Sequence, residues 1–245
     1  MVSFEFTSLR NIKMKIAYNG GFFKGWQRHF SGDGSVEDVL SNAIEGIVGE
    51  KIVLVAASRT DKGVHACGQI VNFRTTSKIE TFELKSELRD KLDNIYILSV
   101  EDVPIFFHSR MHSIGKRYIY QIWNDKKIEK DYHLYCWHLK ERLDLKLMRK
   151  YSTLFLGKRD FKIFSRDDRS KNTIKTIFKI KIHNIKQLVL IEITGDSFLY
   201  NMARCMVASL VALTYGRLKP EDITLEKKEI LIAPPEGLFL DQVFY

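Results

Sequence analysis

The segment SRTDKGVHACGQIVNF, residues 58–73, holds the densest group of side chains that could do chemistry. Arg59, Asp61 and Lys62 precede a turn at Gly63, between two apolar runs that are expected to be strands. A carboxylate near two cations stays ionised, so Asp61 suits a nucleophile or an electrostatic stabiliser rather than a general acid. Catalytic residues are often carried by loops on a rigid scaffold, although a charged hairpin tip is also a common solvated surface.

Two residues far along the chain could complete such a site. Arg204 lies in an otherwise apolar helical run, so it is expected at the exposed edge of the helix or buried beside a carboxylate such as Asp61. Tyr118 lies in GKRYIYQIW, where it would share one face of a strand with Tyr120. Most tyrosines in that arrangement only pack, so the residue pattern by itself gives Tyr118 little functional weight.

The loop FFKGWQRH, residues 22–29, combines aromatic and basic side chains and is suited to contacts with nucleotides. Trp26 could stack on a base, and Lys24 and Arg28 could follow the phosphate backbone. The alternative is that the aromatic rings form a hydrophobic lid over the neighbouring helix.

Patterns for metal and nucleotide binding are missing. His108 and His112 are four residues apart, but FHSRMHS is expected to be a strand, where this is not the spacing of helical metal ligands. Neither GxxxxGK[ST] nor GxGxxG after a strand occurs. What remains is a site of Asp, Tyr and Arg that needs no cofactor.

The positive charge is concentrated in one part of the chain. The net charge is +9, and residues 140–186 carry fifteen Lys and Arg against five Asp and Glu, an excess of ten. One basic region on a balanced protein predicts a polyanion partner, and the alternative is a solubilising surface. The spacing of Lys171, Lys175 and Lys179 predicts that at least two of them lie on one strand face or the adjoining loop, where they would contact phosphates together. A basic amphipathic helix or lipidation site, which would favour a membrane, is not evident.

Cysteine content and hydropathy indicate the cytoplasm. The three cysteines, Cys67, Cys136 and Cys205, are widely separated, which does not fit a disulfide scaffold or a four-cysteine zinc site. No apolar window reaches the length of a membrane span, and the N-terminus lacks the layout of a signal peptide.

The elements that position these residues suggest two α+β halves, at residues 1–105 and 106–245. In the first half the pattern is strand, helix, strand, strand, helix, strand, a split βαβ order with the ferredoxin-like sequence of elements. Its expected elements are a strand at 12–18, a helix from Ser35 to Gly49, strands at 51–57 and after Gly63, a helix at 80–92 and a strand at 94–104. In the second half, the pattern predicts two strands broken near Gly115, a helix at 144–157 and a hairpin at 176–195. It further predicts a long buried helix at 198–216, a short helix from Pro220 and a final strand.

The motifs together resemble the TruA family of tRNA pseudouridine synthases. RTDKGVHACGQIVNF resembles the family's RTD-x-GV-H-A turn, and YNGGFFKGWQR resembles its YDG-x-x-x-x-GWQ opening. Further similar segments follow in the right order over nearly the whole chain: FHSRMHSIGKRYIY, DFKIFS, FLYNMARCMVASL and PPEGLFLDQVFY.

This resemblance implies a cofactor-free isomerase that converts uridine to pseudouridine in the anticodon stem-loop of tRNA, at positions 38 to 40. It implies two ferredoxin-like halves, with antiparallel sheets joined around a central basic cleft, and a homodimer. By similarity Asp61 is the nucleophile, acting at ribose C1′ or promoting elimination there. Arg59 would help to flip the target base, Tyr118 would take the proton from C5, and Arg204 would pair with Asp61.

Further RNA contacts are expected from Lys62, Lys24, Trp26, Arg28 and Arg110. Lys62 stands where many bacterial members have Ala, and Glu37 where they have Gln, which favours a related subset acting on other tRNA uridines as one alternative. A non-catalytic RNA-binding protein on the same fold is a second alternative, and the intact Asp61 and Tyr118 disfavour it. A metal-dependent nuclease is a third, disfavoured because carboxylates are not clustered.

Overall fold

The computed structural model describes residues 9–166, 172–224 and 231–245, which form a mixed α+β fold of two compact units. Unit 1 contains the chain up to Ser113 together with Tyr245, and unit 2 runs from Ile114 to Phe244.

The boundary falls after Ser113, later than the expected boundary after residue 105. The reason lies in residues 104–112, which form turns rather than the expected strand. The side chain of Asn11 donates to the carbonyl oxygens of Pro104 and Phe107, at 3.1 and 2.9 Å, and so ties these turns to unit 1.

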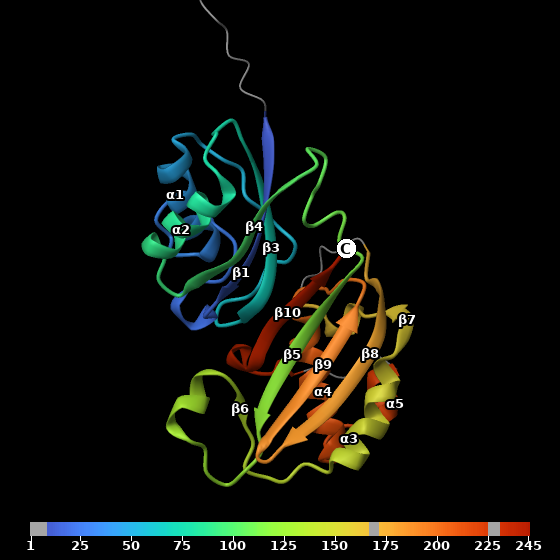
Figure 1. The fold of residues 1–245 in the computed structure, drawn as a ribbon. Helices are drawn as coiled ribbons and strands as arrows, with labels where there is room; N and C mark the ends of the chain where they lie inside the picture. The colour runs from blue at the N-terminus through green and yellow to red at the C-terminus, as the bar shows by residue number, and fades with distance from the viewer. Residues whose placement is uncertain (1–8, 167–171, 225–230) are drawn as a thin grey trace, which may run out of the picture. The chain divides into compact units, whose positions relative to one another are not determined.

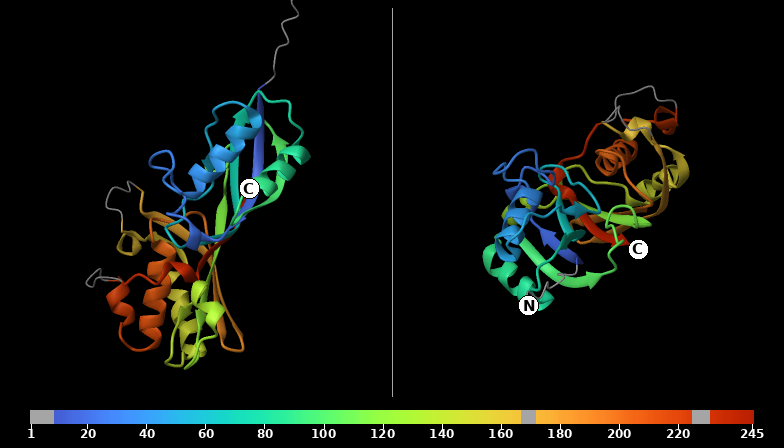
Figure 2. Two further views of the ribbon diagram at one scale, coloured as in Figure 1. Left: turned by 90° about the vertical axis from the view of Figure 1, so that its left-hand side faces the viewer. Right: turned by 90° about the horizontal axis from the view of Figure 1, so that it is seen from above.

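Unit 1 has the expected split βαβ order (Figure 1). Its strands lie in the order β4-β1-β3-β2, and each neighbouring pair is antiparallel. The helices α1 and α2 cover one face of these strands, as the left panel of Figure 2 shows. The elements are β1 (Arg10–Tyr18), η1 (Gly20–Phe22), α1 (Val36–Val48), β2 (Val55–Ala56), β3 (His65–Thr75), α2 (Thr81–Lys91) and β4 (Ile95–Val103).

Local sequence explains most of these boundaries. Ser35 caps α1 by accepting a bond from the N–H of Asp38 at 3.2 Å, and Gly49 ends the helix at φ 75°. In β1 the buried residues Ile12, Met14 and Ile16 alternate with partly exposed lysines, so every second side chain enters the core under the helices. The apolar run at 51–57 forms a strand only at Val55 and Ala56, which is shorter than the sequence predicts.

Unit 2 is built on strands in the order β10-β5-β9-β8-β7, with antiparallel neighbours, and β6 pairs in parallel with β5. The helices α3 and α4 lie on one face of this sheet (Figures 1 and 2). The elements are β5 (Gly115–Trp123), η2 (Lys130–Leu134), β6 (Trp137–His138), α3 (Leu145–Ser152), η3 (Thr153–Phe155), β7 (Gly157–Asp160), η4 (Lys162–Phe164), β8 (Ile174–Ile185), β9 (Leu188–Gly195), α4 (Met202–Thr214), α5 (Pro220–Thr224), η5 (Pro235–Gly237) and β10 (Leu238–Phe244).

The helix α4 is the centre of the unit 2 core. All of its side chains are buried except that of Arg204, which is half-buried. The expected hairpin is present as β8 and β9, and the expected long helix is present as α4. Of the two strands expected around Gly115, only β5 forms, because the residues before it belong to the turns of unit 1.

Candidate active site

The turn that carries Asp61 connects β2 to β3 within unit 1. The N–H of Val64 donates to the carbonyl of Asp61 at 3.1 Å, and Gly63 takes φ 83°, a conformation that favours glycine. Thr60 is buried and Asp61 is half-buried, whereas the side chains flanking this pair, Arg59 and Lys62, are exposed. The turn therefore anchors one residue in the core and presents charged groups at the surface.

The first residue of the turn is held by a buried amide. The side chain of Gln69, on β3, donates from Nε2 to the carbonyl of Ser58 at 2.6 Å and accepts from its N–H at 3.2 Å. Gln69 is fully buried, so this pair of bonds is shielded from water and stronger than an exposed one.

Thr60 is held by two elements at once. Its hydroxyl lies 2.8 Å from the hydroxyl of Tyr18 at the end of β1, and both side chains are buried. Its carbonyl accepts a bond from the N–H of Trp26 at 2.9 Å. The residue directly before Asp61 is thus fixed on its side chain and on its backbone.

Two glycines let the loop after β1 approach this turn closely. A Cβ on Gly20 would lie 2.0 Å from the carbonyl oxygen of Val64. Gly25 has φ 102°, and a Cβ there would lie 3.1 Å from the N of Lys62. Gly20 also donates its N–H to Nδ1 of the buried His65 at 3.2 Å. The Gly-rich opening motif and the RTD turn are therefore packed backbone against backbone.

The structure favours the packing alternative for Trp26 over the expected contact between its ring and RNA. Trp26 is 2% exposed and its ring lies 6.1 Å from that of Tyr18, so the indole cannot stack on a base from outside. The exposed aromatic side chains of this loop are Phe22 and Phe30, each 65% exposed. Sequence reasoning did not single out Phe30, whose position at a glycine-rich turn was the available signal.

The expected basic contacts of unit 1 differ in their surroundings. Lys24, Lys62 and Arg110 have exposed side chains, as Arg59 does. Arg28 is already ion-paired, because its Nε lies 3.3 Å from Oδ1 of the buried Asp38. Arg28 therefore also shapes its own loop.

The candidate residues of unit 2 lie on β5 and at the start of α4. Tyr118 is 6% exposed and its ring meets that of Phe198 edge to face at 4.9 Å. Tyr120, on the same strand face, is fully buried and donates its hydroxyl to the carbonyl of Pro234 at 2.8 Å. Burial raises the pKa of Tyr120 well above its ordinary value, so this hydroxyl stays protonated and structural.

Arg204 is held at its root by the segment before β10. Its Nε donates to the carbonyl of Ala233 at 2.8 Å, and the N–H of Ala233 donates back to the carbonyl of Arg204 at 3.3 Å. This reciprocal pair fixes the direction of the guanidinium. Asp61 lies in unit 1, so its pairing with Arg204 stays a prediction.

The described residues contain no group of three or more His, Cys, Asp or Glu side chains arranged to hold a metal ion. The expected strand around His108 and His112 is wrong, because the N–H of His112 donates to the carbonyl of His108 at 3.0 Å in a turn. Burial raises the pKa of the Cys136 thiol to about 11, which keeps it protonated. No helix in the described part of the chain has the length and apolarity required to cross a membrane.

Relatives with similar sequences extend over the whole chain. A protein of Clostridium tetani named tRNA pseudouridine synthase A 2 is 36% identical, covering 96% of this chain and 99% of its own length. Proteins named tRNA pseudouridine synthase A from Acetivibrio thermocellus and Clostridium botulinum are 36% and 39% identical, each covering 97% of this chain and 100% of its own length. The chain belongs to the TruA family of tRNA pseudouridine synthases.

A family model described as tRNA pseudouridine synthase also matches residues 152–245. A solved structure described as a Cbf5-Nop10-Gar1 complex superposes with a TM-score of 0.36 at 9% identity, covering 82% of this chain and 44% of that one. That likeness is too low to bear on the fold. Membership of the TruA family instead rests on the full-length relatives.

Proposed function

We propose that this member of the TruA family isomerises uridine to pseudouridine in the anticodon stem-loop of tRNA, at positions 38 to 40, without a metal or a cofactor. The observation that carries the proposal is the fixed turn around Asp61. Tyr18 holds the side-chain hydroxyl of Thr60, and Trp26 and Gln69 hold the backbone carbonyls of Thr60 and Ser58, so the turn that carries the carboxylate is positioned before substrate arrives. Such positioning is a large part of how enzymes lower a barrier.

The reaction keeps every atom of uridine. The bond from N1 to ribose C1′ breaks, the base rotates, and a bond from C5 to C1′ forms, after which C5 loses a proton and N1 gains one. Asp61 acts at the sugar, by attack on C1′ or by assisting elimination across C1′ and C2′, and Tyr118 takes the C5 proton. Deuterium at C2′ separates the two routes, since only elimination breaks that C–H bond.

The surrounding cations support the proposed roles. Extruding a uridine from a stacked stem costs roughly a few kcal/mol, which an inserted side chain can offset. Arg59 is exposed beside Asp61 and can fill the vacated space. Arg204, paired with Asp61, would keep the carboxylate ionised through the reaction.

The wider setting follows from the same family. Contacts to the tRNA backbone are proposed for three exposed side chains of unit 1, Lys24, Lys62 and Arg110. Arg28 is proposed to contact the backbone as well, while its ion pair with Asp38 holds it in place. The basic cleft between two ferredoxin-like halves, the homodimer and a cytoplasmic location are parts of this proposal, and sedimentation of the purified protein tests the dimer.

The decisive experiment incubates purified protein with unmodified tRNA transcripts in EDTA and maps pseudouridine by position. We expect product at positions 38 to 40, and no product from Asp61→Asn, which keeps the shape of the side chain and removes its charge. The Asp61→Asn protein should still bind tRNA. A strict metal requirement, or tight binding by the unsubstituted protein without any product, would contradict the proposal. Product only at other uridines would place the chain in the related subset instead.

A further inference from the structure

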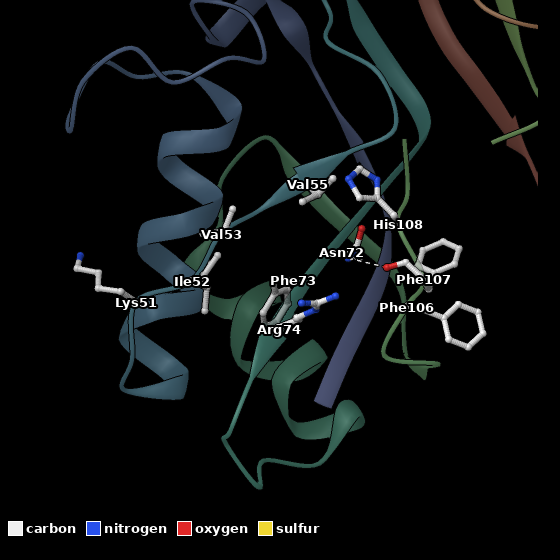
Figure 3. Close-up of a pocket in the computed structure, with 10 residues that line it drawn as sticks. All are labelled: Lys51, Ile52, Val53, Val55, Asn72, Phe73, Arg74, Phe106, Phe107 and His108. Carbon is white, nitrogen blue, oxygen red and sulfur yellow. Dashed lines mark hydrogen bonds between the residues drawn. The ribbon is translucent and has the colours of Figure 1, made fainter. Parts of the chain in front are cut away.

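A pocket of about 440 Å³ opens on unit 1, and the turn that carries Asp61 is not part of its lining (Figure 3). Residues 72–74 of β3 form the floor of the pocket, with residues 51–55 on one side and residues 106–108 on the other. Its volume falls within the range of about 300–1,000 Å³ that is typical of small-ligand sites.

The wall formed by residues 106–108 is firmly anchored. Asn72, at the floor, accepts the N–H of Ser109 at 2.9 Å, and its Nδ2 lies 3.0 Å from Oδ1 of Asn11. The hydroxyl of Ser109 donates to the carbonyl of Val55 at 2.7 Å and so joins the two walls. The pocket is therefore a formed feature of the unit and does not depend on a mobile segment.

The rim of the pocket is apolar and open. Val53 and Phe106 are 79% and 72% exposed, on opposite sides of the floor strand in Figure 3. The ring of Phe106 meets that of His112 edge to face at 6.4 Å, which limits its rotation. A large, exposed and oriented aromatic ring is a platform on which a flat apolar group can stack.

Two side chains of the pocket, Arg74 and His108, can donate hydrogen bonds to a ligand. Arg74 lies beside the floor and donates from Nη2 to the carbonyl of Ile105 at 3.1 Å, and no carboxylate of the described residues pairs with it. Nδ1 of His108 accepts the N–H groups of Arg110 and Met111, both at 3.2 Å, so the ring offers its Nε2–H as a donor. Among the described residues, no acidic side chain lines the pocket.

The geometry points to a second RNA subsite that holds one unpaired nucleotide of the tRNA, distinct from the uridine that reacts. The base stacks on Phe106, its acceptors face the Nε2–H of His108, and its phosphate meets the guanidinium of Arg74. An aromatic platform next to a cationic guanidinium and a second donor is a combination that suits single-stranded RNA. A carboxylate-rich partner would match the donors and leave the aromatic platform unused. This inference rests on the proposed function, because it takes its ligand from the same substrate.

The test compares Phe106→Ala with Met111→Ala, a matched control in the same turns that removes another exposed apolar side chain. We expect Phe106→Ala to weaken tRNA binding roughly five- to 100-fold, as loss of one stacked base does, while kcat at saturating tRNA stays unchanged. Arg74→Gln should weaken binding in the same direction, and Met111→Ala should not. With p-benzoylphenylalanine in place of Phe106, irradiation should crosslink one unpaired nucleotide outside positions 38 to 40.

Each failure has its own signature. If the unsubstituted protein makes pseudouridine and Phe106→Ala binds tRNA with unchanged affinity, the subsite is overturned and the proposed function stands. If the unsubstituted protein makes no product but the crosslink forms, the proposed function fails and the subsite stands. A Phe106→Ala protein that changes its sedimentation without changing its affinity for tRNA assigns the pocket to contact between copies, which also overturns the inference.

Discussion

The hydroxyl groups of Tyr18 and Thr60 lie 2.8 Å apart, and both side chains are buried. This contact joins the last residue of β1 to the residue directly before Asp61. A neutral hydrogen bond between buried groups is worth about 1 kcal/mol net, and losing one partner leaves the other unsatisfied at a cost of about 1–3 kcal/mol. The position of the Asp61 turn thus depends on a side chain that would not itself touch the substrate.

Tyr18→Phe should therefore lower kcat and leave tRNA affinity unchanged. The ring and its packing remain, and the hydroxyl that bonds Thr60 is lost. We expect kcat to fall roughly tenfold, which corresponds to about 1.4 kcal/mol in the barrier. Single-turnover kinetics with saturating enzyme gives the rate, and filter binding gives the affinity.

A double-mutant cycle checks that the effect passes through Thr60. Thr60→Val removes the other hydroxyl, and the double variant Tyr18→Phe with Thr60→Val should be about as slow as either single variant. Additive losses of rate would mean that Tyr18 acts by another route.

Gly20→Ala should destabilise unit 1 because the new Cβ would lie 2.0 Å from the carbonyl oxygen of Val64. The backbone must shift, and we expect a loss of about 1–3 kcal/mol in the free energy of unfolding. Gly46→Ala is the matched control, since Gly46 lies inside α1 with no heavy atom within 4 Å of its Cβ position. That change should stabilise the protein by about 0.5–1 kcal/mol. Urea unfolding of both variants measures the difference, and equal midpoints would contradict the close approach.

Sequence patterns predicted the elements that are governed by local chemistry. The helix α1 begins after the capping Ser35 and ends before Gly49, as the Ser, the apolar periodicity and the Gly indicate. The strand order of unit 1 also follows from its element order, because a split βαβ unit has few ways to pair. The Asp61 turn was recognisable because its charges interrupt apolar runs.

What the sequence could not show depends on contacts between distant residues. Gln69 and Tyr18 read as ordinary strand residues, and only the fold reveals that they hold Ser58 and Thr60. The sequence suggests Trp26 as an RNA contact because its loop combines aromatic and basic side chains, yet its ring is buried beside Tyr18. Periodicity describes which face of an element is buried, and it does not describe which side chain lies opposite.

Tyr118→Phe should block proton removal from C5, while Tyr120→Phe should affect only stability. Both variants keep the ring and lose the hydroxyl on one face of β5, so they are matched. The hydroxyl of Tyr120 donates to Pro234 and its loss should cost about 1 kcal/mol of stability. We expect Tyr118→Phe to accumulate a rearranged intermediate or to form product at least 100-fold more slowly, as loss of a general base does. Product formation at the unsubstituted rate would return Tyr118 to a packing role against Phe198.

A test of RNA binding by the basic segment 140–186 should replace a different set of lysines from the one that the sequence suggests. Lys171 lies outside the described residues. A β-bulge between Ile177 and Lys179 reverses the faces of β8, so Lys175 and Lys179 do not share one as their spacing predicts. Lys179 and Lys181 do share a face, opposite Thr194 and Glu192 of β9, and both are exposed.

Replacing Lys179 and Lys181 together with Gln should therefore flatten the salt dependence of tRNA binding. Each lost phosphate contact lowers the slope of log K against log salt by about 0.7–0.9, so the pair should lower it by up to about 2. All tRNAs should weaken similarly, since phosphate contacts position the RNA and carry no sequence information. The control replaces Lys91 and Lys127, two exposed lysines outside the segment, and removes the same charge. If the two double variants have equal slopes, the segment is a solubilising surface and the tRNA backbone lies along Lys24, Arg28 and Lys62 instead.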